Sequence, residues 1–161
     1  MLELRESLAS VVACHAAADV LDGFTIEATV SVRVAQDELL LISEPSRCDQ
    51  VLVRAEEALA PVDGLVVDVS DGYAVWTLHG DWREAWARLC AVPSPPASAC
   101  VQGLFAGVPA KLVSAEEELL VMASSVLSQH VRERVLSACH DLDPQELEPT
   151  PLSVPAYEAA V

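Results

Sequence analysis

The sequence has few aromatic residues and little positive charge. Aromatic side chains make up 4% of the 161 residues, so a core must be built mainly from leucine, valine and alanine. Nine Lys and Arg residues stand against 25 Asp and Glu residues, which gives a formal net charge of −16 at pH 7. Such a field repels nucleic-acid phosphates, and no basic patch reverses it. We expect this surface to keep the chain in solution or to dock on a basic partner.

Signals for membranes, nucleotides and disulfides are also missing. The start, MLELRESLAS, carries acids and no long apolar run, so we predict no secretory signal. No apolar stretch approaches the roughly 20 residues that span a bilayer. The sequence has no G-x-G-x-x-G, Walker or H-E-x-x-H motif. Its five cysteines are odd in number and form no C-x-x-C, which favours reduced thiols in the cytoplasm.

What the sequence does have is a hydrophobic content of 52%, enough for a real core. Apolar spacing alternates between helical and strand periods, which predicts an α+β fold. The helices are expected at 3–22, 47–60, 82–91 and 126–140, and the strands at 25–34, 38–42, 65–70, 73–78, 104–114 and 118–123. Asp71-Gly72 predicts a hairpin turn between two of these strands, and the PSPP string at 93–96 predicts a rigid break.

Two stretches of the sequence resemble each other at a constant spacing. Laying QDELLLISEPSRCDQVLVRAEEAL, from Gln36, on EEELLVMASSVLSQHVRERVLSAC, from Glu116, aligns Glu38 with Glu118 at an offset of 80. Each copy predicts a strand followed by an amphipathic helix. We therefore predict one domain over 1–140 with an internal pseudo-repeat, at about 23–64 and 100–140. Residues 141–161 are predicted to form an acidic, proline-rich tail without a core of its own.

The string A-C-H occurs twice, ending at His15 and at His140. Two Cys and two His could hold zinc, but neighbouring residues point in different directions, so we favour core cysteines with surface histidines and predict no metal. A Cys/His nucleophile pair meets the same objection. Lys111 is the only lysine; an activated amine or anion contact is possible, and a strand side chain in water is the simpler interpretation.

Two further groups of residues admit a functional and a structural interpretation. Asp68 and Asp71 flank the expected hairpin and could form an acid pair, although turn chemistry explains Asp71. Trp82 and Trp86 could anchor a protein interface, or form the buried stripe of their helix. No catalytic residue is predicted from these patterns.

The segment DVSDGYAVWTLHGDWREAWARLCAV resembles folate-binding aminomethyltransferase domains of the glycine cleavage T-protein type. The pattern of that family reads roughly D-x-S-x-x-x-x-L-x-G-x-x-A-x-x-L, and this segment has the same residue types in the same order at partly longer spacings. The matching residues are Asp68, Ser70, Leu78, Gly80, Ala85 and Leu89. The order of later strings, L-C-A-V from Leu89 and Q-G-L-F-A from Gln102, is similar to the gamma subunit of heterotetrameric sarcosine oxidase. The upstream string AQDELLLISEP resembles a strand of the same family.

This resemblance covers about residues 36–140 and implies both a fold and a role. The implied fold has duplicated ferredoxin-like halves with an antiparallel sheet. In the family, flavin and folate belong to the larger subunits, and no catalytic position carries over to this chain. The resemblance therefore implies a non-catalytic accessory subunit of a flavin- and folate-dependent oxidase, in a hetero-oligomer with larger proteins and with no cofactor of its own.

Two alternatives remain open at this point. The first is a stand-alone folate-binding, one-carbon-transfer protein, for which Asp68 and Glu84 are the candidate pterin-binding carboxylates. The second is the same fold used as a protein-binding module for an unrelated enzyme, since a fold does not fix a function.

Overall fold

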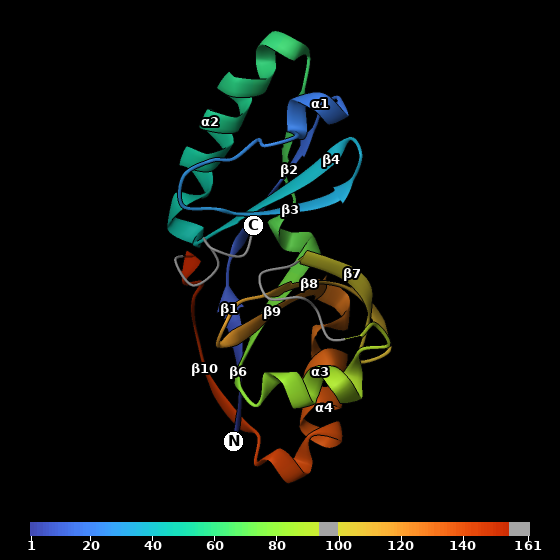
Figure 1. Cartoon of the computed structure of the whole chain (residues 1–161). Coiled ribbons are helices and arrows are strands. Elements are labelled where there is room, and N and C mark those ends of the chain that lie inside the picture. Colours follow the sequence, from blue (N-terminus) through green and yellow to red (C-terminus); the bar gives the residue numbers. More distant parts are fainter. Residues whose placement is uncertain (94–99, 155–161) are drawn as a thin grey trace. The chain divides into compact units, whose positions relative to one another are not determined.

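The computed structural model describes residues 1–93 and 100–154 (Figure 1). Helices are combined with two sheets whose strands pair mainly antiparallel, so the predicted α+β class is confirmed. The chain divides into two compact units. Unit 1 comprises Met1–Ser7 and Asp71–Thr150, and unit 2 comprises Leu8–Ser70 and the segment that begins at Pro151. In the described ranges no helix is long and apolar enough to cross a membrane.

Unit 2 is a four-stranded sheet with one long helix. Its elements are β2 (Ser10–His15), α1 (Ala18–Leu21), β3 (Val30–Ala35), β4 (Glu38–Ser43), α2 (Cys48–Leu59) and β5 (Leu65–Asp68). The sheet order is β3-β4-β2-β5, and each neighbouring pair is antiparallel. Figure 1 shows α2 alongside these strands.

The helix α2 forms because its apolar residues recur at helical spacing. Val51, Ala55 and Leu59 are buried at positions i, i+4 and i+8, on the face that packs against β2 and β4. Pro45 opens the preceding 3-10 turn, where a missing N–H is not needed. The strand predicted at 38–42 and the helix predicted at 47–60 are both confirmed.

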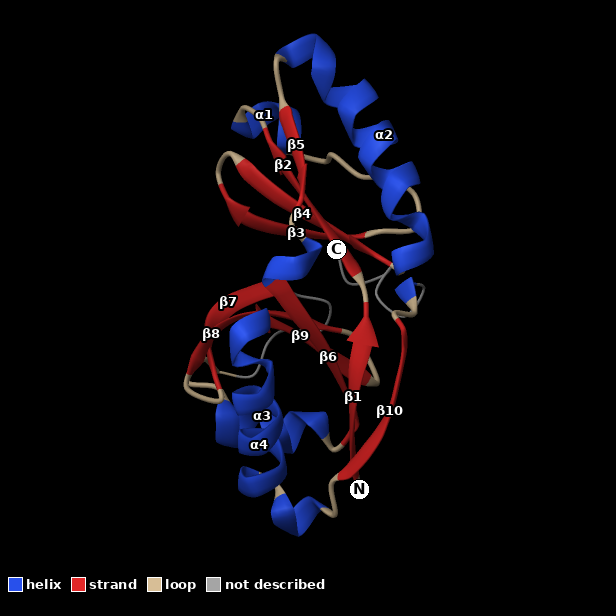
Figure 2. Cartoon of the chain, turned by 180° about the vertical axis from the view of Figure 1, so that it is seen from behind, coloured by secondary structure: helices blue, strands red, loops and turns tan. Residues whose placement is uncertain are grey.

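Unit 1 contains a six-stranded sheet and two helices. Its elements are β1 (Leu2–Leu8), β6 (Tyr73–Gly80), α3 (Trp82–Leu89), β7 (Cys100–Phe105), β8 (Val108–Ser114), β9 (Glu118–Ser124), α4 (Ser128–Ala138) and β10 (Gln145–Pro151). The sheet order is β10-β1-β6-β9-β8-β7. Figure 2 shows α3 and α4 side by side; their apolar residues share one buried cluster with one face of the sheet.

Several element boundaries recur at the offset of 80 that relates the two similar sequences. Strands β4 and β9 begin 80 residues apart, at 38 and 118, and helices α2 and α4 begin at 48 and 128. The same offset continues past the similar sequences. It relates the 3-10 turns at 60–62 and 140–142, and the starts of β5 and β10 at 65 and 145. Asp63 and Asp143, also 80 apart, both have a left-handed backbone, with φ of 53° and 49°.

The helix predicted at 3–22 is wrong. The stretch forms β1, β2 and the four-residue helix α1. In β1 the buried residues Leu2 and Leu4 alternate with the partly exposed Glu3 and Arg5, which is a strand period. In β2 the residues are buried on both faces, so no alternation distinguishes it from a helix.

Two further predictions of local structure need correction. Asp71-Gly72 does not join a hairpin, because β5 and β6 belong to different sheets and residues 70–72 form a 3-10 turn. The strand expected at 104–114 is interrupted at Ala106 and Gly107, both with positive φ, where the β7–β8 hairpin turns. The PSPP string at 93–96 lies mostly outside the described residues.

The segment after Asp141, predicted as a tail without a core of its own, contains a strand that joins the unit 1 sheet. Gln145–Pro151 forms β10 at the edge of the unit 1 sheet, where prolines are tolerated because one side needs no N–H donors. Leu152 and Val154, which follow, are 4% and 5% exposed.

Candidate functional site

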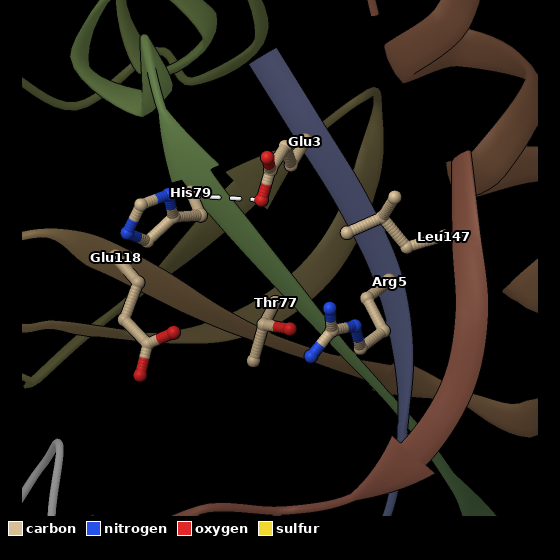
Figure 3. A pocket seen from close by; sticks show the side chains of 6 residues that line it. All are labelled: Glu3, Arg5, Thr77, His79, Glu118 and Leu147. Atoms are coloured by element: carbon tan, nitrogen blue, oxygen red, sulfur yellow. Dashed lines mark ion pairs between the residues drawn. The ribbon is translucent and has the colours of Figure 1, made fainter. Parts of the chain in front are cut away.

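Unit 1 has a small pocket on the sheet, and polar side chains supply most of its wall. It measures about 120 Å³. The lining residues are Glu3, Arg5, Thr77, His79, Glu118 and Leu147 (Figure 3). They come from β10, β1, β6 and β9, which follow one another in this order in the sheet.

Strand alternation places these residues on one face. In β6 the buried Trp76 and Leu78 join the helix-covered core, so the alternate residues Thr77 and His79 point to the opposite face. The register then sets the rows across the sheet. His79 lies opposite Glu3 on one side and Glu118 on the other, and Thr77 lies opposite Arg5.

In the row formed by Glu3, His79 and Glu118, carboxylates surround a histidine. His79 Nδ1 lies 3.8 Å from a carboxylate oxygen of Glu3, and His79 Nε2 lies 3.7 Å from one of Glu117. Figure 3 shows His79 and Glu3 facing each other across the two strands. The side chains of His79 and Glu117 are 50% and 81% exposed, so these ion pairs are surface pairs that contribute little to stability.

In the row formed by Arg5 and Thr77, the guanidinium of Arg5 makes few hydrogen bonds. Arg5 Nη1 donates one long hydrogen bond, 3.4 Å, to Thr150 Oγ1, and Arg5 Nε is buried without a hydrogen-bond partner among residues 1–93 and 100–154. The hydroxyl of the neighbouring Thr77 is 3.1 Å from that of the buried Ser7. A guanidinium offers five N–H donors, so this one is well short of its bonding capacity.

The arrangement is therefore a cavity with separated charges. In Figure 3 the Arg5 guanidinium and the Glu118 carboxylate lie on either side of Thr77. Such a site can hold a small polar molecule by hydrogen bonds and charge. In the described part of the chain, no group of three or more His, Cys, Asp or Glu side chains is arranged to hold a metal ion.

Asp68, a candidate from the sequence, lies in unit 2 and serves its own turn. Its Oδ1 accepts hydrogen bonds from the Ser70 backbone N–H at 2.9 Å and from Ser70 Oγ at 2.6 Å, and these bonds lower the pKa of Asp68. Its Oδ2 lies 3.6 Å from the thiol of Cys48. Asp71 begins unit 1 and is exposed, so the two aspartates belong to different units.

The other candidates fall in unit 1. Glu84 is exposed in the first turn of α3. Trp82 and Trp86 are 2% and 1% exposed and lie in the core cluster, and Trp86 Nε1 donates to the carbonyl of Val92 at 2.9 Å. The two tryptophans thus form the buried stripe that the sequence left as the alternative to an interface.

The two A-C-H strings occupy unlike environments. Cys14 is buried in β2, and burial raises the pKa of its thiol to about 11. Cys139 is buried at the end of α4, while His140 next to it is exposed. Lys111, in β8, places its Nζ 5.1 Å from the centroid of the Tyr73 ring. Cys14 and Cys139 are therefore core residues. Burial raises the pKa of both thiols, which opposes formation of the thiolate that nucleophilic chemistry needs.

The sequence analysis missed Arg5, Thr77 and His79. The alternation in LELRE and WTLH was the available signal, since it puts Arg5 and Thr77 on the face opposite the core. The helix predicted at 3–22 hid the first of these strings, and the pairing of β1 with β6 joins residues that are 70 to 78 positions apart.

No family model and no curated protein matches the sequence. Solved structures do match the fold. One is a chain of heterotetrameric sarcosine oxidase from Corynebacterium sp. U-96 in complex with pyrrole 2-carboxylate: the TM-score is 0.72, the identity 17%, and the match covers 91% of this chain and 87% of that one.

Two other structures share the fold more distantly. Aminomethyltransferase T of the glycine cleavage system from Bartonella henselae matches with a TM-score of 0.63 and 10% identity, over 91% of this chain and 47% of that one. The regulatory subunit of aspartate kinase from Thermus thermophilus, in its ligand-free form, matches with a TM-score of 0.53 and 11% identity, over 84% and 96%. At these identities the comparisons show the fold alone: a mixed α+β fold with two largely antiparallel sheets, similar to that of the sarcosine oxidase chain and of the aminomethyltransferase.

Proposed function

We propose that this chain is a non-catalytic accessory subunit of a larger oxidase complex. The observation that carries the proposal is the match to one chain of a heterotetrameric enzyme over 91% of this chain and 87% of that one. Coverage that is near-complete in both directions supports the proposal, because the two chains are similar in fold over most of their lengths. Its partners would be larger flavin- and folate-dependent proteins in the cytoplasm, and the net charge of −16 suits a basic docking surface.

Comparison with the aminomethyltransferase supports the accessory role. This chain spans 47% of that enzyme, so it has the fold of part of a catalytic protein. Asp68, which would hold a pterin in a stand-alone protein, already accepts two hydrogen bonds from Ser70 at one carboxylate oxygen. Two pterin hydrogen bonds would have to compete with that turn.

The proposal includes a duplicated architecture. We infer that each unit is a copy of a ferredoxin-like β-α-β-β-α-β block, with the pseudo-repeat at about 23–64 and 100–140 as its most similar part. In unit 2 the block is β2, α1, β3, β4, α2 and β5; in unit 1 it is β6, α3, β8, β9, α4 and β10. The common offset of 80 and the antiparallel strand orders support this inference.

Affinity purification from the native host at natural expression level tests the subunit role. We expect the tagged chain to elute with larger proteins in fixed stoichiometry and with the absorbance of bound flavin. Light scattering after gel filtration gives the mass of the assembly. A single species at the chain's own 17.2 kDa, free of other polypeptides, would contradict the proposal.

A stand-alone folate-binding protein is the second candidate, favoured by the TM-score of 0.63 to an aminomethyltransferase. Calorimetry with a reduced folate decides this case. Saturable binding that is lost in Asp68→Asn or in Glu84→Gln would replace the accessory role with folate binding. Absence of heat at high micromolar folate would remove the candidate.

A further inference from the structure

We propose that the pocket of Glu3, Arg5, Thr77, His79, Glu118 and Leu147 binds a short ω-amino carboxylate, with its carboxylate on Arg5 and Thr77 and its ammonium group on Glu118. This proposal concerns unit 1 alone and is independent of the proposed accessory role. The juxtaposition that carries it is an under-used guanidinium and a carboxylate on opposite sides of one small cavity.

The first argument is the state of Arg5. Its only hydrogen bond within the described chain is the 3.4 Å contact to Thr150, and its Nε is buried without a partner. The two Nη groups carry four of the five N–H donors of a guanidinium and make one long hydrogen bond within the described ranges, so donors remain for an acceptor from outside the chain. Because protein atoms cover Nε, an incoming carboxylate meets the Nη groups and the hydroxyl of Thr77.

The second argument is charge. A simple anion on Arg5 would also meet the carboxylates of Glu3 and Glu118 and the field of a chain with net charge −16. A simple cation near Glu118 would meet Arg5. A molecule with both charges satisfies both ends and is neutral overall, so the site discriminates against either half of such a molecule.

The third argument is spacing. Strands β1 and β9 lie about 10 Å apart, with β6 between them. Arg5 lies opposite Thr77 and Glu118 opposite His79, so the two are also displaced by two residues along the strands and their backbones are roughly 12 Å apart. The two side chains and the two charge-assisted hydrogen bonds, each about 2.8 Å, occupy much of that span. What remains fits a chain of a few bonds, and the cavity of about 120 Å³ admits a molecule of that size. Leu147 on β10 provides an apolar contact at the edge.

Binding of β-alanine to the full chain, followed by ¹H–¹⁵N NMR titration, tests the proposal. Propionate and propylamine are the matched probes, because each keeps the three-carbon chain and one of the two charges. We expect saturable shifts for amides of β1, β6 and β9 with β-alanine, at a dissociation constant on the order of millimolar, since so few atoms limit the affinity. Each single-charge probe should bind about tenfold more weakly or worse.

Variants separate the two ends of the site. Arg5→Gln should weaken β-alanine by about tenfold or more, because a charge-assisted bond is lost. Glu118→Gln should weaken β-alanine and strengthen propionate, because it removes an attraction to one and a repulsion to the other. Arg134→Gln is the control: this arginine is exposed on α4 and the charge change is the same.

Three results would overturn the proposal: propionate binding as tightly as β-alanine, equal loss of affinity in Arg134→Gln and Arg5→Gln, or no saturable shift in the folded wild-type chain. Should Arg5→Gln not fold, the opposite responses of Glu118→Gln to the two probes carry the test alone. Failure here leaves the purification result untouched, so the two proposals fail separately.

Discussion

The strand that follows the second helix pairs with different neighbours in the two units. In unit 2, α2 leads through a 3-10 turn and Asp63 to β5, which pairs directly with β2. In unit 1, α4 leads through the equivalent turn and Asp143 to β10, but the sheet order places β1 between β6 and β10. The N-terminal strand thus occupies a position for which unit 2 has no counterpart.

The contacts of the two strands differ accordingly. Leu52 of α2 and Val66 of β5 both pack on the apolar core of unit 2. At the offset of 80 the matching residues are Arg132 and Glu146, which form a hydrogen-bonded ion pair between α4 and β10. A second pair, Arg88 with Asp141, joins α3 to the turn before β10. An inserted strand moves β10 outward, and charged contacts replace apolar ones there.

The largest losses of stability should come from matched residues in the separate cores of the two units. Leu39 and Leu119 are matched by the offset, and both face a helix. We expect Leu39→Ala and Leu119→Ala each to lower the free energy of unfolding by about 2–5 kcal/mol, measured by urea denaturation. Val53→Ala, on the exposed side of α2, is the control and should stay within about 0.5 kcal/mol. A large cost in one unit only would break the equivalence of the two cores.

A smaller loss of unfolding free energy is expected from truncating Leu152, the residue that follows β10. After β5 the chain enters unit 1, whereas after β10 it continues to Leu152, which is 4% exposed and donates its backbone N–H to the carbonyl of Leu8 at 2.9 Å. Leu152→Ala should cost about 2–3 kcal/mol of unfolding free energy. Val126→Ala, at 86% exposure, should change little. Equal effects would mean that the C-terminal segment carries no packing.

The sequence predicted the repeated strand and helix because their signals are local. Leu39, Leu40 and Leu41 make a short apolar run, and Val51, Ala55 and Leu59 keep the helical period. The strands β1 and β10 were missed because their partners are distant. LELRESLASVV offers spacings that suit a helix as well as a strand, and only pairing with β6 selects the strand.

The hairpin expected at Asp71-Gly72 failed for a related reason. The turn signal is real, since residues 70–72 do turn, but it cannot show that the flanking strands join different sheets. The pocket depends on the same long-range pairing. Its residues from β1, β6 and β9 are separated in sequence and become a site only when the strand order is known.

The smallest predicted effect concerns the ion pairs of β10. The hydrogen bonds of Arg132 hold the pKa of Glu146 below its ordinary value, and those of Arg88 do the same for Asp141. A lowered folded-state pKa contributes stability above the unfolded pKa, and the contribution is lost as pH falls through the folded one. The contact between α4 and β10 should therefore loosen on the acid side of pH 4.5, whereas the matching contact of β5 is made by Val66, which does not titrate. The lowered pKa of Asp68, at the end of β5, concerns its own turn with Ser70.

NMR titration of the side-chain carboxyl groups measures this directly. Arg132→Gln should return the pKa of Glu146 towards its ordinary value. Arg134→Gln should leave it unchanged, because Arg134 is exposed and lies two residues after Arg132, on a different face of α4. Amide exchange in β10 should accelerate with Arg132→Gln by a small factor only, since exposed ion pairs contribute little to stability. Equal acceleration in β5 would show that the ion pair is not specific to the strand that β1 displaced.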